Sequence, residues 1–212
     1  ELVSDRTRAI IAMDYGSALA DHDAVAGLAA RHGLRVLHDA AHSFGGRRNG
    51  VPVGAFSDLC MFSFDPVKNI TCVDGGALVL RDPALVQRVH ELRLIGMSQP
   101  AAVMYQNQRA WTYDVRALGF RYHMPNLHAA IGQAQLARLP EIGATRRATC
   151  EHYQTAFAGL PELVLPRGPF DEACPFLYTV LVPAGRRDAF RAPLAGHGVA
   201  SGIHWQPGHR FT

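Results

Sequence analysis

Short apolar runs alternate with amphipathic segments along the first part of the chain. Residues 9–13 (AIIAM) form an apolar run of strand length. Asp21 and Gly33 then bracket a helical segment, as an N-cap and a C-terminal stop. A second apolar run follows at residues 34–37. Strand, helix and strand in such quick succession are typical of a βαβ crossover in a parallel sheet.

Two further apolar runs extend the predicted sheet. They cover residues 59–64 and 77–80, and the turn sequence DGG introduces the second. Asp82 and Pro83 then open a helix, which we expect to stop at Gly96. The pattern therefore predicts an α/β protein.

Prolines divide the following helical region. Pro125 precedes one helical segment, and Pro140 separates it from a second helix over residues 141–157. A proline-rich passage over residues 161–175 then indicates a connection between two domains.

The last part of the chain predicts two more strands around one helix. The strands are FLYTVLV (residues 176–182) and ASGIHW (residues 200–205), and the helix covers residues 187–195 with Pro193 inside it.

Composition excludes several classes of protein. The 21 Lys and Arg and 18 Asp and Glu give a formal charge of +3, spread without a basic run, so neither nucleic acid nor an anionic membrane is an expected partner. No apolar run approaches the length of a membrane span. The four cysteines show no CxxC spacing, so reduced thiols are expected. These features predict a globular cytoplasmic protein.

We expect the chain to be an internal fragment of a longer protein. Its first residue is not methionine, and it stops at HWQPGHRFT without a closing element. Without further strands the predicted sheet would keep an unpaired edge, so we expect the fragment alone to be inactive and poorly stable.

Two charged residues lie just past predicted strand ends. Asp39 follows the run at 34–37, and Lys68 follows the run at 59–64. In open α/β sheets, ligands bind beyond the carboxyl ends of the strands, so an acid and an amine there should converge on one ligand. The pair suits pyridoxal 5′-phosphate (PLP), because a lysine forms a Schiff base with its aldehyde and a carboxylate keeps its pyridine nitrogen protonated. A solvated lysine and a turn-forming aspartate are the alternative.

Three segments resemble successive motifs of a known family. They are DAAHSFGG, GAFSDLCMFSFDPVKNITCVDGGALV and GFRYHMPNLHAAIGQAQL, and in order and spacing they are similar to motifs of the DegT/DnrJ/EryC1/StrS sugar aminotransferases. The resemblance implies the three-layer, mostly parallel large domain of fold-type I PLP enzymes, incomplete here, over residues 1–139. It implies that residues 140–212 begin a smaller α+β C-terminal domain.

The resemblance also implies roles for site residues. Lys68 would be the Schiff-base lysine and Asp39 the partner of the pyridine nitrogen. Ala41 would lie against one face of the ring, and Ser63 would bind the phosphate. His42, where many relatives have glutamine, would lie near the cofactor's 3-oxygen.

Two further residues have weaker support from the resemblance. Arg121 stands where relatives commonly have asparagine, in a loop that reaches the partner subunit's phosphate across a dimer interface; a surface arginine is the alternative. His204 matches a loop that approaches the sugar nucleotide, but it would also suit a half-buried strand.

The implied function is transfer of an amino group, from glutamate, to a keto carbon of a nucleotide-linked deoxysugar. The enzyme would be a homodimer with shared active sites, acting in deoxysugar or polysaccharide biosynthesis. A non-catalytic or regulatory fragment of the same fold is the alternative, because the family's upstream phosphate-binding turn is absent from this sequence.

His38 and His42 raise a second alternative, a metal-binding hydrolase. Their i, i+4 spacing is that of the zinc-binding helix in HExxH enzymes. That spacing brings two imidazoles together only on a helix, whereas His38 closes an apolar strand and SFGG follows His42. We therefore expect the two rings to diverge and predict no metal site.

Overall fold

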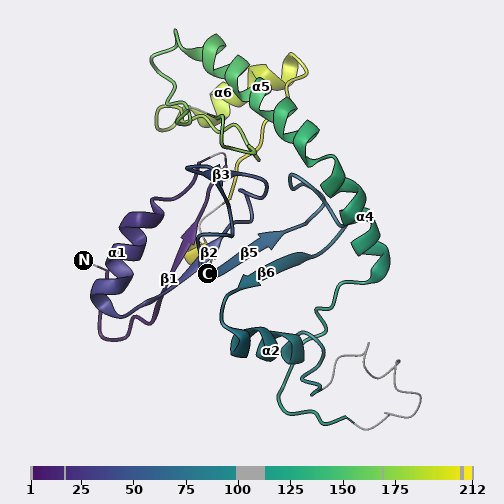
Figure 1. Cartoon of the computed structure of the whole chain (residues 1–212). Coiled ribbons are helices and arrows are strands. Elements are labelled where there is room, and N and C mark those ends of the chain that lie inside the picture. The colour runs from purple at the N-terminus through teal and green to yellow at the C-terminus, as the bar shows by residue number, and fades with distance from the viewer. Residues whose placement is uncertain (1, 17, 99–112, 169, 206–207, 212) are drawn as a thin grey trace.

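The computed structural model describes residues 2–16, 18–98, 113–168, 170–205 and 208–211. A sheet of four strands, in the order β1-β2-β5-β6, forms its centre (Figure 1). These strands are β1 (Ala9–Met13), β2 (Arg35–Asp39), β5 (Leu59–Ser63) and β6 (Gly76–Leu80). A small antiparallel pair, β3 (Arg47–Arg48) and β4 (Val51–Pro52), lies between β2 and β5 in the chain.

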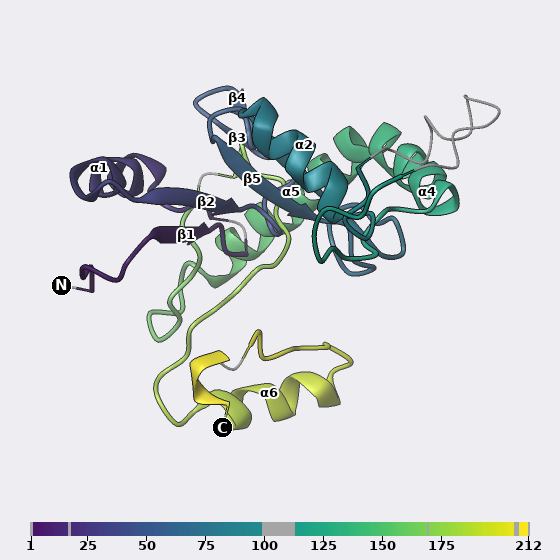
Figure 2. The same ribbon diagram turned by 90° about the horizontal axis from the view of Figure 1, so that it is seen from below.

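Most of the helices lie around this sheet (Figures 1 and 2). They are α1 (His22–His32), α2 (Pro83–Leu92), α4 (Asn126–Ala137), α5 (Leu139–Phe157) and α6 (Arg187–Gly196), with a 3₁₀ turn η1 at Gly208–Arg210. Figure 2 shows α6 set apart from the sheet at the end of a long connection. None of the described helices is both long and apolar enough to cross a membrane.

The sheet is mainly parallel, which confirms the predicted βαβ crossover. β2 pairs in parallel with both β1 and β5, and β6 runs antiparallel to β5. In this register Met13, Asp39 and Met61 are aligned. The carboxyl ends of the three parallel strands therefore meet at one edge of the sheet.

Local chemistry explains where α1 begins and ends. The Asp21 side chain accepts a hydrogen bond from the Ala24 N–H, which satisfies a donor of the first turn. Gly33 takes a left-handed conformation with φ of 63° and donates to the Ala29 carbonyl oxygen. Both ends lie at the predicted residues.

The helix that follows β6 ends earlier than predicted. Its start is as expected, with Asp82 accepting from the Ala84 N–H and Pro83 in the first turn. It ends at Leu92 rather than at Gly96, because the chain after it pairs with a later segment. The Ile95 N–H donates to the Phe120 carbonyl oxygen at 2.9 Å. Because this N–H is already bonded to a later segment, the helix does not continue through Ile95.

Two predicted strands of the C-terminal part are wrong. Within FLYTVLV, only Leu181 forms a bridge, with Val164, and ASGIHW forms no strand in the described residues. A strand needs a hydrogen-bonded neighbour along its length, and these backbones have other partners. The Phe176 N–H donates to the Gly16 carbonyl oxygen, and the His204 carbonyl oxygen accepts from the Tyr15 hydroxyl.

Helix α4 packs closely against the loop that follows β5. A Cβ atom added at Gly132 of α4 would collide with the Sγ of Cys72, which is buried. Gly132 therefore lets α4 approach the loop that contains Lys68. The predicted boundary near residue 139 coincides with the start of α5, but the division into two domains stays a prediction.

We expect Gly132→Ala to lower the free energy of unfolding of the full-length protein by about 1–3 kcal/mol, because the added methyl group overpacks a closed contact. Gly27→Ala in α1 is the matched control, since a Cβ there meets only the flexible Arg31 side chain, at 3.6 Å. The control should gain about 0.5–1 kcal/mol from helix propensity. Urea unfolding checks both, and equal effects in the two variants would contradict the packing.

Candidate functional site

Asp39 and Lys68 lie at the same edge of the sheet. Asp39 is the last residue of β2, and its Oδ1 accepts a hydrogen bond from the Ala41 N–H at 3.1 Å. Lys68 lies in the loop after β5, where its N–H donates to the Asp65 carbonyl oxygen at 3.0 Å. Partial burial lowers the pKa of Lys68, although the charges of Asp65 and Asp39 oppose that shift.

Asn69 anchors the Lys68 loop, and it is not among the residues predicted from the sequence. Its amide nitrogen donates to the carbonyl oxygens of Phe44, at 3.2 Å, and Cys174, at 2.7 Å. Asn69 is buried, so these two bonds hold the residue next to Lys68 between the chain after β2 and a segment more than 100 residues away. The feature of the sequence that could have pointed to Asn69 is its position directly after Lys68.

His42 is buried and neutral beside the lysine. Its Nδ1 accepts the Gly16 N–H at 3.3 Å, which leaves Nε2 to carry the proton of the ring. Burial, followed by the positive charge of Lys68, lowers the pKa of His42 to about 4. His42 can therefore donate a hydrogen bond at neutral pH without adding charge.

Phe176 brings Lys68, His42 and His204 together. The Lys68 Nζ lies 4.4 Å from the centre of the Phe176 ring, and the His42 ring centre lies 4.3 Å from it. The rings of His42 and His204 stack at 5.1 Å, and the Tyr15 hydroxyl donates to the His204 carbonyl oxygen. The His204 Nε2 is buried and has no hydrogen-bond partner in the described part of the chain. Burial and Lys68 lower the pKa of His204.

The other predicted site residues are less closely grouped. Ala41 opens the turn after β2, and Ser63 ends β5, where its Oγ accepts the Asp65 N–H at 3.4 Å. Arg121 is exposed and forms a backbone bridge with Leu94. For the residues described, the structure gives no hydrogen bond or ion pair between Arg121 and Lys68 or Asp39. The roles of Ala41, Ser63 and Arg121 stay predictions.

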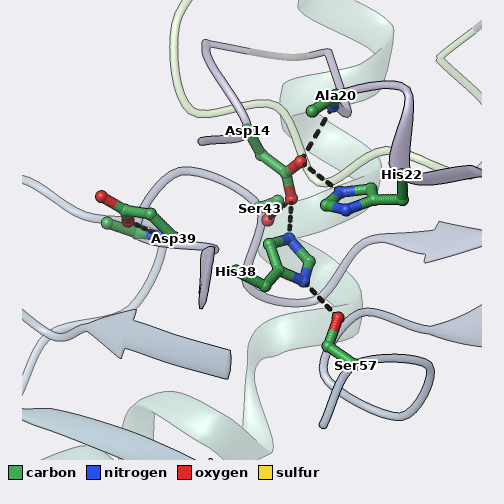
Figure 3. Close-up of polar contacts among 8 residues, drawn as sticks. Asp14, Ala20, His22, His38, Asp39, Ser43 and Ser57 are labelled. Carbon is green, nitrogen blue, oxygen red and sulfur yellow. Dashed lines mark hydrogen bonds and ion pairs between the residues drawn. The ribbon is translucent and has the colours of Figure 1, made fainter. Parts of the chain in front are cut away.

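His38 lies among Asp14, His22 and Ser57 (Figure 3) and not with the residues around Lys68. The His38 Nε2 lies 2.6 Å from the Asp14 Oδ2, and its Nδ1 lies 2.8 Å from the Ser57 Oγ. His22 contacts the other oxygen of Asp14, at 2.8 Å. Among the described residues, His42 belongs to no group of three metal-ligating side chains, so the structure gives no support to a site built on His38 and His42.

Asp14 connects these polar groups, and neither it nor His22 is predicted from the sequence. Burial alone would raise the pKa of Asp14, but hydrogen bonds from His38, Ser43 and the Ala20 N–H lower it overall. The feature of the sequence that could have pointed to Asp14 is its position as a polar residue directly after β1, because the end of β1 lies at the same sheet edge as Asp39.

Solved structures of other proteins share this fold. AtS13 from Actinomadura melliaura superposes with a TM-score of 0.87 at 31% identity, over 100% of this chain and 57% of that protein. The aminotransferase TlmJ from Streptoalloteichus hindustanus gives a TM-score of 0.87 at 30% identity, over 99% of this chain and 55% of its own. The sugar aminotransferase CalS13 from Micromonospora echinospora gives 0.81 at 25% identity, over 94% and 54%.

The chain spans about half the length of these solved structures. The model of one protein family matches it from residue 1 to residue 212. The chain therefore belongs to the DegT/DnrJ/EryC1/StrS aminotransferase family.

Proposed function

We propose that the full-length protein is a PLP-dependent aminotransferase that moves an amino group from glutamate to a keto carbon of a nucleotide-linked deoxysugar. Membership of the family supports amino transfer, and homologues in the family bind PLP. The observation that carries the proposal is the convergence of Asp39 and Lys68 at the carboxyl edge of the parallel strands. Residues 1–139 would belong to the cofactor-binding domain, and residues 140–212 would begin the small domain.

The residues at this edge fit PLP by their chemistry. Lys68 offers an amine that forms no salt bridge with any described residue, and partial burial lowers its pKa. Asp39 offers a carboxylate, Ser63 a hydroxyl group and His42 a neutral imidazole. Bound PLP supplies an aldehyde carbon that takes up an amino group and a pyridine ring that withdraws electrons from the substrate carbon.

Lys68 and Asp39 would perform the chemical work. A lowered pKa leaves more of the Lys68 amine uncharged, so Lys68 would hold the cofactor through this amine. Once a donor amine has displaced it, the free Lys68 amine would take a proton from the substrate Cα as a base. Asp39, oriented by the Ala41 N–H, would hold the proton of the pyridine nitrogen by electrostatics and would not transfer it.

The remaining residues would bind and orient. The His42 Nε2–H would donate to the cofactor's 3-oxygen and the Ser63 hydroxyl to its phosphate, while the small side chain of Ala41 would allow close approach to the ring. His204 would contact the sugar nucleotide. In a C2 homodimer, Arg121 would reach the phosphate in the other subunit's site.

We expect the full-length protein to bind PLP with a yellow colour and to lose that colour in Lys68→Ala, because the lysine amine makes the covalent bond. Borohydride treatment should fix a pyridoxyl group on the peptide that contains Lys68, as seen by mass spectrometry. Lys68→Arg is the matched control for charge and should also stay unlabelled. Label on a different lysine would show that the assignment is wrong.

We expect glutamate alone to convert the cofactor to its amine form, with one equivalent of 2-oxoglutarate per site. Asp39→Asn should still take up PLP but perform this half-reaction at least about 100-fold more slowly, because the pyridine nitrogen loses its anionic partner. Absorbance and product analysis measure both. A protein that binds PLP through Lys68 but is inert with glutamate and other amino donors would support the regulatory alternative.

We expect an NMR titration to place the pKa of His42 near 4, well below the usual 6.5. Because the folded protein disfavours the charged form, His42 should reduce stability as the pH falls from about 6.5 and cause no further loss below about 4. His42→Gln should remove this part of the acid sensitivity. Lys68→Met should raise the pKa of His42, because it removes a nearby positive charge. A pKa near the ordinary 6.5 in the wild-type protein would contradict the burial of His42.

A further inference from the structure

Three side chains of types that commonly bind metal ions in proteins meet on the opposite side of β2 from Asp39 (Figure 3). They are Asp14, after β1, His22, the first residue of α1, and His38, within β2; we call them the Asp14 cluster. The ligand atoms that the three offer all lie within 4.8 Å of one another. All three side chains are buried, with His38 and Asp14 at 0% exposure and His22 at 8%.

We propose that the Asp14 cluster binds one divalent transition-metal ion, of which Zn²⁺ is the expected species. Two imidazole nitrogens and one carboxylate oxygen form a donor set suited to such ions. The Nε2 atoms of His22 and His38 lie 2.8 and 2.6 Å from separate oxygens of Asp14. Both imidazoles therefore present the same nitrogen to a single carboxylate, and an ion there would replace the protons that now lie between them.

The surroundings of His38 suit a metal ligand. Its Nδ1 lies 2.8 Å from the Ser57 Oγ. When Nε2 binds an ion, a neutral ring keeps its proton on Nδ1, and the Ser57 oxygen can accept that hydrogen bond. An outer partner of this kind fixes both the tautomer and the orientation of a ligating histidine.

The surroundings of Asp14 complete the site. The Ala20 N–H donates to its Oδ1 at 3.0 Å, and the Ser43 hydroxyl donates to its Oδ2 at 2.5 Å. These two donors orient the carboxylate. The Ser43 oxygen, or a water molecule, would be the fourth ligand of a tetrahedral ion.

Burial indicates a structural ion and not a catalytic one. Catalytic zinc sites keep a position open to substrate, whereas the side chains of this cluster are almost completely enclosed. The ion would connect the end of β1, the start of α1 and the body of β2, and so would brace the strand that ends in Asp39. This proposal does not depend on PLP binding.

A cluster held by hydrogen bonds alone is the competing explanation. Asp14 already accepts four hydrogen bonds, two at each oxygen, which is enough to satisfy a buried carboxylate. Metal binding measured on defined variants separates the two explanations.

The test uses the full-length protein, freed of any affinity tag and stripped with a chelator. With Zn²⁺ we expect one tightly bound ion per chain by elemental analysis and a rise in Tm; Co²⁺ should give the visible absorption of a tetrahedral site. Asp14→Asn and His22→Gln keep a polar group of similar size and should each weaken Zn²⁺ binding at least about 100-fold, while Ser57→Ala should weaken it about 10-fold. Circular dichroism shows whether each variant folds.

His32→Ala is the matched control, because His32 lies on the same helix as His22 but is exposed. It should bind Zn²⁺ as the wild type does. Three results would overturn the proposal: no stoichiometric ion in the wild type, undiminished binding in folded Asp14→Asn and His22→Gln, or loss of binding in His42→Gln with His22→Gln unaffected. The last result would instead favour a site that includes His42.

Discussion

The parallel register of β1, β2 and β5 is the constraint on which both polar sites depend. Because Met13, Asp39 and Met61 are aligned, the residues just beyond each strand are brought to one edge of the sheet. Side chains alternate along a strand, so the adjacent residues His38 and Asp39 point to opposite faces of β2, as Figure 3 shows. A one-residue slip in the pairing of β2 would exchange the two side chains and disrupt both sites.

Residues 174–176, from the second half of the chain, bind to the loops that follow β1 and β5 at the carboxyl edge of the sheet. The Cys174 carbonyl oxygen accepts from Asn69, the Phe176 N–H donates to Gly16, and Arg146 of α5 donates to the Phe176 carbonyl oxygen at 3.1 Å. A typical hydrogen bond contributes about 1 kcal/mol net, but a buried group left without its partner costs more. These bonds therefore fix where the Phe176 ring lies, and through it the surroundings of Lys68.

The parts of the structure encoded locally could be predicted from the sequence. The strand β1, the caps of α1 and the lysine that follows β5 each depend on a few neighbouring residues. FLYTVLV could not be assigned correctly, because an apolar pattern predicts a strand without showing whether a pairing partner is there. The Asp14 cluster could not be predicted either, because its members come from three elements, whereas the sequence pattern paired His38 with a residue four positions away.

The electrostatic arrangement around Lys68 explains why histidines can surround an amine without repelling it. Burial lowers the pKa of both His42 and His204, and the positive charge of Lys68 acts in the same direction. Both imidazoles are therefore held in the neutral form, in which one ring nitrogen donates and the other accepts a hydrogen bond. Burial lowers the pKa of Lys68 as well, but the charges of Asp65 and Asp39 oppose that shift and favour the protonated amine.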